Sequence, residues 1–238
     1  MNSLSTRLDS YLVENGFVDS RNKAKELITQ GFVEVDGNLC KKPARKVKDA
    51  CIKLLQRVYI SRAGRKLEGF LQSCGCSVEA KECLDIGAST GGFVQILLEK
   101  GAKSVTAVDV GTNQLAKSLQ QDSRVIDVSP CDIRDFVSDS GYDLVTCDLS
   151  FISLQSVLDS IVRLAKDEVI ILFKPQFEVG RQCKRNAKGV IQDSSAVQEA
   201  IERFEAAVAP HMKIKSKQQS TLKGKEGNVE YIYWLAKY

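Results

Sequence analysis

Ionisable side chains recur at the ends of short apolar segments in the second part of the sequence. Asp85, Asp109 and Asp132 each lie at or just after the end of such a segment, and Lys174 follows another, Val169 to Phe173. Carboxylates in these places can accept hydrogen bonds from hydroxyl and amino groups. If the segments are parallel strands, their carboxyl ends converge on one crevice, where ligands bind. These residues therefore predict a ligand site at one edge of a sheet.

A glycine-rich stretch follows the first of these segments. It reads Asp85, Ile86, Gly87, Ala88, Ser89, Thr90, Gly91, Gly92, Phe93. Glycines between a strand and a helix let the backbone approach a ligand closely, and the helix N-terminus offers free N–H groups to an anion. The spacing G-x-x-x-G-G fits the G-x-G-x-x-G fingerprint of dinucleotide enzymes poorly. It is typical of the loop that holds the methionine moiety of S-adenosylmethionine, and a purely structural glycine turn is the alternative.

Asp109 and Asp132 suit the nucleoside part of the same ligand. Asp109 can accept two hydrogen bonds from ribose hydroxyls, and Asp132 can accept one from an adenine amino group. Either acid alone could be a solvated loop residue, so the prediction depends on three acids at successive strand ends. The predicted cofactor contacts are Asp85, Gly87, Ala88, Ser89, Gly91, Gly92, Phe93, Asp109, Val110, Asp132 and Ile133.

Lys174 and Asp148 are candidates for the chemistry itself. Burying an ammonium group is costly, so a lysine at the inner end of a buried apolar strand indicates a function. The alternative is a surface lysine just past the strand. Asp148 begins the stretch Asp148, Leu149, Ser150, Phe151. Methyltransferases that act on base nitrogens often carry two prolines at this place, and their absence argues against that class.

Alternating strands and helices must position these residues. The expected strands span 82–86, 104–109, 125–128, 142–147 and 169–173, and the main helices span 92–100, 154–166 and 195–209. Two closely spaced strands, 212–220 and 229–236, end the pattern. The alternation predicts a Rossmann-like α/β fold, with a mostly parallel seven-stranded sheet between helices. The final pair predicts a hairpin that places one antiparallel strand at the edge.

The first sixty residues predict a separate small α+β unit. A first helix is indicated by apolar residues at helical spacing, namely Leu4, Leu8, Leu12 and Val13. A second helix would start at Asp19 or Ser20 and end at Gly31. Phe32 to Gly37 reads as a strand that enters an Asp-Gly turn, and Cys51 to Leu55 reads as another strand. We expect domains at 1–58 and 81–238, joined by a linker and leading helix at 59–80.

Positive charge is concentrated in this first unit. The chain has a net charge of +4, yet residues 1–66 carry 14 basic and 7 acidic side chains, against 20 and 23 in the remainder. This asymmetry indicates a polyanion-binding front end, with an ordinary solvated surface as the alternative. A second basic segment, 179–193, could contact phosphates or close over the site, or be a solvated loop. The predicted contacts to a polyanion are Arg7, Arg21, Lys23, Lys25, Lys41, Lys42, Arg45, Arg62, Arg65, Arg181, Lys184 and Arg185.

Composition argues against several other classes of protein. Hydrophobic residues make up 43% of the chain, which suffices for a core, and the apolar runs are too short to cross a bilayer. The polar start, Met1 to Asp9, lacks an apolar signal core, so we expect a soluble cytoplasmic protein. Eight cysteines read as free thiols, with Cys83 and Cys147 buried in strands. A single histidine and a single close cysteine pair argue against a metal site.

Four stretches together resemble the TlyA family of rRNA cytidine-2′-O-methyltransferases, historically labelled haemolysin A. They are Asp85 to Phe93, Val108 to Leu115, Asp148 to Ser153 and Phe173 to Glu178. Residues 5–55 resemble the ribosomal-protein-four type of RNA-binding module, also called the αL motif. The resemblance covers essentially the whole chain. The little sequence before the first helix and the end just after the last strand resemble the shorter family form, which is associated with large-subunit rRNA.

The resemblance implies a catalytic tetrad of the wider FtsJ-like class. The matching residues are Lys66, Asp148, Lys174 and Glu230, with Glu226 as a less fitting alternative to Glu230. In this scheme Asp148 and Glu230 hold the Lys174 amine, and Lys66 is a second cation beside it. The implied cofactor is S-adenosylmethionine, and the implied partner is ribosomal RNA or a ribosomal subunit. We expect no membrane partner and a monomer. Alternatives are a non-catalytic RNA-binding or assembly factor, a small-molecule methyltransferase and a membrane-active haemolysin.

Overall fold

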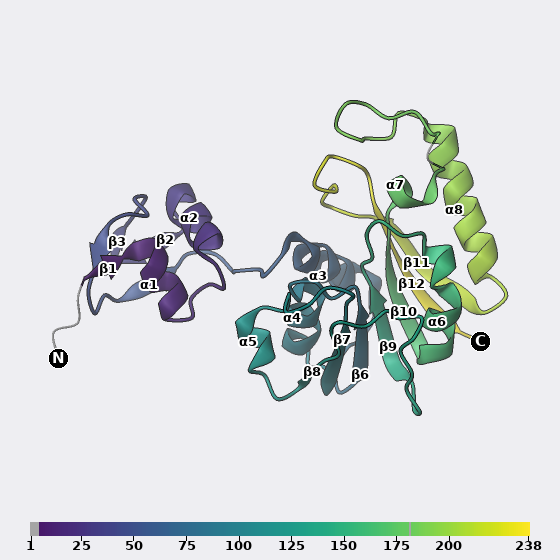
Figure 1. Ribbon diagram of the computed structural model, residues 1–238, viewed down its shortest axis with the longest axis horizontal. Coiled ribbons are helices and arrows are strands. Elements are labelled where there is room, and N and C mark those ends of the chain that lie inside the picture. The colour runs from purple at the N-terminus through teal and green to yellow at the C-terminus, as the bar shows by residue number, and fades with distance from the viewer. Residues whose placement is uncertain (1–4, 181) are drawn as a thin grey trace. The chain divides into compact units, whose positions relative to one another are not determined.

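The computed structural model describes residues 5–180 and 182–238, so Leu4 and Arg181 lie outside the described residues. The chain divides into two compact units (Figure 1). The first comprises the chain up to Ile60, with Ala116–Ser118 grouped with it. The second comprises Ser61–Leu115 and Leu119–Tyr238.

The first unit consists of two helices and short antiparallel strands. Helix α1 (Leu8–Glu14) and helix α2 (Arg21–Gln30) pack on strands ordered β3 (Asn38–Leu39), β2 (Val33–Val35) and β5 (Ile52–Leu54), while β1 (Thr6–Arg7) pairs with β4 (Lys46–Val47). The start and the end of α2 are as predicted. The Ser20 hydroxyl accepts from the Lys23 N–H, and Gly31 is left-handed at φ 82°. Apolar residues on one side of each helix form a separate core.

The predicted Asp-Gly turn lies between β2 and β3. Asp36 and Gly37 both have positive φ, 52° and 77°, and Val35 pairs with Asn38 across the turn. Two consecutive left-handed residues match the right-handed twist of a hairpin, and Asp and Gly tolerate that conformation best. The turn therefore sets the register in which Val33 and Val35 point into the core.

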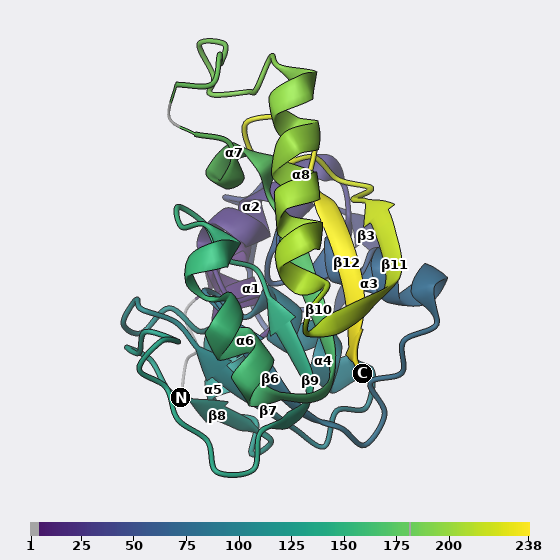
Figure 2. The ribbon, with the colours of Figure 1, turned by 90° about the vertical axis from the view of Figure 1, so that its right-hand side faces the viewer.

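The second unit is built on a seven-stranded sheet, as predicted (Figures 1 and 2). Its order is β11 (Met212–Gln219), β12 (Tyr231–Lys237), β10 (Ala165–Phe173), β9 (Tyr142–Cys147), β6 (Glu82–Ile86), β7 (Ser104–Val108) and β8 (Val125–Asp127). All neighbours from β10 to β8 are parallel, whereas β12 is antiparallel to both β10 and β11. The last strand of the chain, β12, is antiparallel to its neighbours as predicted. Its expected position at the edge was wrong, because β12 inserts between β10 and β11 and leaves β11 outermost.

Helices cover both faces of this sheet. Figure 2 shows α6 (Leu158–Leu164) and α8 (Ser194–Val208) on one face, and α3 (Arg62–Cys74) and α4 (Gly92–Glu99) on the other. The expected helix 154–166 is instead a 3-10 turn, η1 (Leu154–Ser156), followed by α6, and β10 already begins at Ala165. Two short helices, α5 (Lys117–Gln120) and α7 (Pro175–Glu178), complete the set.

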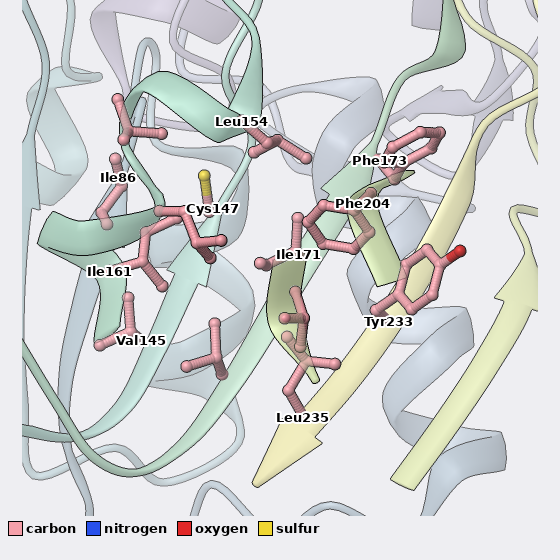
Figure 3. Packing of buried hydrophobic residues seen from close by; sticks show 14 of the residues in the cluster. Ile86, Val145, Cys147, Leu154, Ile161, Ile171, Phe173, Phe204, Tyr233 and Leu235 are labelled. Carbon is pink, nitrogen blue, oxygen red and sulfur yellow. The ribbon is translucent and has the colours of Figure 1, made fainter. Parts of the chain in front are cut away.

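The α6 and α8 face contains the larger part of the core. Phe173, Phe204 and Tyr233 meet there with ring centroids 5.1–6.0 Å apart (Figure 3). Cys147 lies in the same cluster and Cys83 is fully buried in β6, so both cysteines are buried in strands as predicted. Phe173 is the last residue of β10 and immediately precedes Lys174. The core therefore fixes the end of the strand from which Lys174 projects.

Helices α3 and α4 approach each other closely through two glycines. A Cβ atom on Gly64 of α3 would lie 2.8 Å from the carbonyl oxygen of Gly92, the first residue of α4. Only glycine allows this separation without a shift of backbone. Lys66 lies two residues after Gly64, so the contact sets the position from which Lys66 projects.

The two glycines of α3 provide a matched test of this contact. We expect Gly64→Ala to be less stable than Gly69→Ala by about 1–3 kcal/mol, because its methyl group meets backbone whereas that of Gly69→Ala would meet only the Thr221 hydroxyl, at 3.7 Å. Gly69→Ala should itself gain up to about 1 kcal/mol from helix propensity. Urea unfolding followed by the fluorescence of Trp234, the single tryptophan and a residue of β12, measures both. Equal stability of the two variants would contradict the close contact.

Candidate active site

Four predicted catalytic residues come from four separate segments of the second unit. Lys66 lies on α3, Asp148 follows β9, Lys174 follows β10, and Glu230 directly precedes β12. Because β9 and β10 are parallel neighbours, Asp148 and Lys174 emerge at the same edge of the sheet. The structure brings the four together as two ion pairs.

The first pair joins Lys66 to Glu230. The Lys66 Nζ lies 2.5 Å from the Glu230 Oε2, and the two side chains are only 8% and 3% exposed. The other carboxylate oxygen, Oε1, accepts a hydrogen bond from the Gln176 Nε2 at 3.3 Å. The expectation that Glu230 holds the Lys174 amine was therefore wrong, because its two oxygens bind Lys66 and Gln176. The sequence alone could not show whether Glu230 pairs with Lys66 or with Lys174, because the two lysines lie far apart along the chain.

The second pair joins Lys174 to Asp148. The Lys174 Nζ lies 2.7 Å from the Asp148 Oδ1, as an ion pair, and also donates a hydrogen bond of 2.8 Å to the Ser150 Oγ. Burial raises the pKa of the Asp148 carboxyl, while the Lys174 ammonium opposes that rise. A lysine whose side chain is only 11% exposed and is held on two sides by oxygen atoms is oriented for a reaction on its remaining side.

Asp85 lies at the bottom of the glycine-rich loop. Its Oδ1 accepts a hydrogen bond from the Thr146 hydroxyl at 2.7 Å, and its Oδ2 is buried without a hydrogen-bond partner among the described residues. Complete burial raises the pKa of this carboxyl to about 7. A buried acceptor left unpaired is costly, so the arrangement fits a donor that arrives with a ligand.

A cavity of about 150 Å³ opens above Asp85. The starts of α3 and α4 border it, and the loop between β6 and α4 supplies most of its wall. Gly87 and Gly91 have left-handed φ of 79° and 93°, and Ser89 adopts 47°. A Cβ on Gly87 would lie 3.0 Å from the Asp148 carbonyl oxygen, so glycine is needed there. The cavity is lined by Ser61, Ala63, Asp85, Gly87, Ala88, Ser89, Thr90, Gly92, Phe93, Asp148, Ser150 and Lys174.

A second cavity, of about 160 Å³, lies beyond Gly87 and is mostly apolar. The predicted nucleoside contacts Asp109, Val110, Asp132 and Ile133 all line it. The Asp109 carboxylate accepts from the backbone N–H groups of Ser89 and Gly111, at 2.9 and 2.7 Å. Asp132 pairs with Arg134 at 2.5 Å, and hydrogen bonds from Arg134 lower the pKa of Asp132 to about 2. Both acids thus line the cavity as acceptors that already have protein partners.

A third and larger cavity, of about 750 Å³, adjoins the two ion pairs. Cationic side chains predominate on its wall, which is a suitable surface for a polyanion. The charged residues that line it are Arg62, Lys66, Lys174, Arg185, Lys188, Lys225, Glu226 and Glu230. Of these, Arg185 donates to the backbone oxygen of Gln176 at 3.0 Å, and Arg62 donates to that of Lys223 at 2.6 Å.

Phe151 was missed by the sequence reasoning, although it belongs to a quoted motif. Its side chain is 91% exposed at the wall of the large cavity, and its backbone is left-handed at φ 67°. The ring packs on Phe177 with centroids 5.2 Å apart. A strained backbone conformation that exposes a large aromatic ring is typical of a binding site. Lys188 belongs to the basic segment 179–193, for which the sequence suggested contact with phosphates, and it lines the same cavity. Lys225 was missed, since nothing in the local pattern distinguishes it from a solvated lysine.

The predicted RNA contacts fall into both units. In the first unit, Arg7 and Arg21 hold the fully buried Asp9 at 3.0 and 3.1 Å, and hydrogen bonds from Arg7 lower the pKa of Asp9 to about 2. Lys23 pairs with Glu26 on α2. The remaining predicted residues of that unit, Lys25, Lys41, Lys42 and Arg45, are exposed. In the second unit Arg62, Arg65 and Lys184 are exposed and Arg185 is half-buried.

Two further observations concern the whole described chain. Within residues 5–180 and 182–238, every helix is too short or too polar to span a membrane. All eight cysteines are free thiols, and the described residues contain no cluster of three metal-ligating side chains.

Family models match both units of the chain. A model described as FtsJ-like methyltransferase matches residues 59–237, and one described as S4 domain matches residues 6–50. The 23S rRNA (cytidine-2′-O)-methyltransferase TlyA of Campylobacter jejuni subsp. jejuni serotype O:23/36 (strain 81-176) is 45% identical over 229 residues, which cover 96% of this chain and 85% of that protein. The 16S/23S rRNA (cytidine-2′-O)-methyltransferase TlyA of Mycobacterium tuberculosis (strain ATCC 25618 / H37Rv) is 39% identical over 242 residues, which cover 96% and 89%.

Solved structures show the same architecture. A Streptococcus thermophilus protein, provisionally named a hemolysin, has a TM-score of 0.72 at 36% identity and covers 98% of this chain and 88% of its own. The N-methyltransferase NodS from Bradyrhizobium japonicum WM9, in complex with S-adenosyl-L-homocysteine, has a TM-score of 0.53 at 14% identity over 73% and 86%. At that identity NodS shares the fold alone.

The pKa of Asp85 leads to a pH-dependent stability that a substitution should remove. Its folded pKa of about 7 lies above the ordinary value, so the folded state retains a proton that the unfolded state releases, and stability falls as pH rises toward 7. Asp85→Asn keeps the shape without the charge. We compare the free energy of unfolding of Asp85→Asn with that of the unchanged chain. We expect this difference to shift in favour of the variant by about 2–3 kcal/mol between pH 5 and pH 8.

Urea unfolding at the two pH values measures this difference. Asp167→Asn, at an exposed acid beyond the cavities, is the control and should show little change. A stability difference for Asp85→Asn that is the same at pH 5 and pH 8 would show that Asp85 is already ionised in the folded protein.

Proposed function

The chain belongs to the FtsJ-like methyltransferase family, and on this premise we propose that it transfers a methyl group from S-adenosylmethionine to a cytidine ribose 2′-hydroxyl of ribosomal RNA. The observation that carries the proposal is the position of Lys174. Its side chain, paired with Asp148, lines both the 150 Å³ cavity and the 750 Å³ cavity. A methyl donor in the first and an RNA nucleotide in the second would therefore meet at Lys174.

The small cavities fit the proposed cofactor by their chemistry. The unpartnered Asp85 Oδ2 would pair with the α-ammonium group of the methionine moiety. The starts of α3 and α4 offer backbone N–H groups for the carboxylate at the same cavity. The adjoining apolar cavity, with Asp109 and Asp132 at its wall, would hold the adenosine. When bound, S-adenosylmethionine supplies a sulfonium methyl group that is open to in-line displacement.

Lys174 and Asp148 would act on the acceptor hydroxyl. A ribose 2′-hydroxyl is a weak acid and a poor nucleophile, so the protein must orient it and remove or polarise its proton. The Lys174 Nζ is the nitrogen placed between the cavities, and Asp148 keeps it there. A neutral Lys174 amine would take the proton as general base, and a charged one would orient the oxygen by donating to it.

Lys66 and Glu230 line the acceptor side of the site. Both belong to the wall of the large cavity, and their opposite charges form an ion pair. A buried pair of this kind is a weak source of stability, because desolvating both charges offsets their attraction. We therefore assign it a functional role, in which the Lys66 ammonium donates to a ribose oxygen and Glu230 keeps that ammonium in place.

The choice of ribosomal RNA rests on the first unit and on the relatives. The S4 domain match and the exposed basic residues of the first unit suit a large polyanion. The names of two relatives specify cytidine in rRNA, and both include 23S rRNA. We propose large-subunit 23S rRNA as substrate, the cytoplasm as the place of the reaction, and a monomer as the acting species.

A non-catalytic RNA-binding or assembly factor is the second candidate. It would need the basic surface but would have no use for a buried ion pair at the large cavity, or for Lys174 and Asp148 at the cavity that contains an unpaired Asp85 oxygen. A haemolytic activity is favoured by the name of one relative, Hemolysin A of Brachyspira hyodysenteriae, which is 37% identical over 235 residues. The described side chains provide no physical argument for membrane lysis.

Transfer of labelled methyl groups to isolated ribosomal subunits tests the proposed function. We expect label in large-subunit rRNA, recovered as 2′-O-methylcytidine after digestion. Lys174→Ala should reduce the rate by at least about 10²-fold, because it removes a positioned acid–base group. The matched control is Lys213→Ala, which changes an exposed lysine of β11 and should leave the rate unchanged.

Two results would contradict the proposal. Label on a base atom instead of the ribose would assign a different reaction to the same site. A lack of transfer to subunits and intact ribosomes by a chain that binds S-adenosylmethionine would favour the non-catalytic role.

A further inference from the structure

We propose that Ser150 is a positioning residue, whose hydroxyl fixes the direction in which the Lys174 Nζ faces the methyl acceptor. The inference rests on the proposed methyl transfer and adds a residue to it. Ser150 lies in the turn that follows β9, two residues after Asp148.

Ser150 lies at the junction of the whole site. It lines the 150 Å³ cavity, the 160 Å³ cavity and the 750 Å³ cavity alike. Ser150 is exposed, and its Oγ accepts a hydrogen bond of 2.8 Å from the Lys174 Nζ. A hydroxyl at this junction reaches the lysine without being enclosed by the core.

The chemistry of an amine explains why a second oxygen matters. The Lys174 nitrogen has one bond to carbon and three further directions, which an ammonium fills with three N–H groups. The Asp148 Oδ1 lies 2.7 Å from the nitrogen as its ion-pair partner but accepts no hydrogen bond from the described residues, whereas the Ser150 Oγ accepts one of the N–H groups at 2.8 Å. In a neutral amine with one N–H group held by Ser150, the Asp148 carboxylate would repel the lone pair, so the lone pair would point in the third direction. With Asp148 alone, rotation about the last carbon–nitrogen bond would exchange that lone pair with an N–H group.

The local backbone holds the hydroxyl in this place. The Asp148 N–H donates to the Ile86 carbonyl at 2.9 Å, and Phe151 adopts a left-handed φ of 67° immediately after Ser150. These two features fix the two ends of the short segment that contains Ser150. The next serine, Ser153, has a different task, because its hydroxyl accepts from the Gln155 N–H and donates to Glu178. Ser150 is therefore the serine of this loop that is directed to Lys174.

Single-turnover methyl transfer at saturating cofactor and RNA tests the inference. We expect Ser150→Ala to lower the transfer rate by about 10- to 100-fold, because a misoriented reacting group has a cost of this order. The KM for RNA and the Kd for S-adenosylmethionine should each change by less than about threefold, since no substrate-binding charge is lost. Ser150→Thr keeps the hydroxyl and should restore the rate to within about threefold.

Control variants separate this role from loss of structure or of the proposed function. Ser123→Ala, at another exposed serine, should leave all three quantities unchanged. If Ser150→Ala transfers at the rate of the unchanged chain, or if Ser150→Thr is as slow as Ser150→Ala, the positioning role is overturned while the proposed function stands. If the unchanged chain transfers no methyl group, both fail together.

Discussion

The ion pair between Lys66 and Glu230 is the interaction on which the site depends. It joins α3 to the segment before β12 across 164 positions of the sequence, with both side chains buried. Neither charge could remain there alone, because an unpaired buried charge costs several kcal/mol. The pair therefore ties the helix that begins the second unit to the last strand of the chain, which lies between β10 and β11. The large cavity lies along this connection, with Lys174 on its wall.

The order of the strands explains how residues that are far apart in the sequence come together in one site. Strands β6, β9 and β10 run parallel, so Asp85, Asp148 and Lys174 lie at the same edge of the sheet, the one formed by the carboxyl ends of these strands. Strand β12 runs the opposite way beside β10, so the residue before its start, Glu230, lies at that edge as well. An antiparallel strand at the outer edge would have placed Glu230 one strand further from Lys174. The insertion of β12 is thus what allows a residue near the end of the chain to meet Lys66.

Local features of the sequence predicted much of the fold and many of the residues that line the two small cavities. The glycine-rich loop and the acids after β6 and β7 could be identified because parallel strands must converge at their carboxyl ends, whichever neighbours they have. The internal place of β12 and the partner of Glu230 could not be predicted, since strand order and long-range pairing leave no local pattern. Phe151 and Ser150 stood in a recognised motif, but only the left-handed turn and the position of Lys174 gave them a role.

Replacing the buried pair as a whole separates its structural role from its chemical one. Lys66→Met and Glu230→Leu should each destabilise the protein by about 3–5 kcal/mol, whereas the double variant should recover most of that stability, because no charge is left unpaired. The decisive measurement is methyl transfer to large ribosomal subunits by the double variant. We expect the double variant to be stable and to bind S-adenosylmethionine, but to transfer methyl groups at least about 10²-fold more slowly than the unchanged chain. A stable double variant with undiminished transfer would contradict this expectation, because Lys66 and Glu230 would then serve the fold alone.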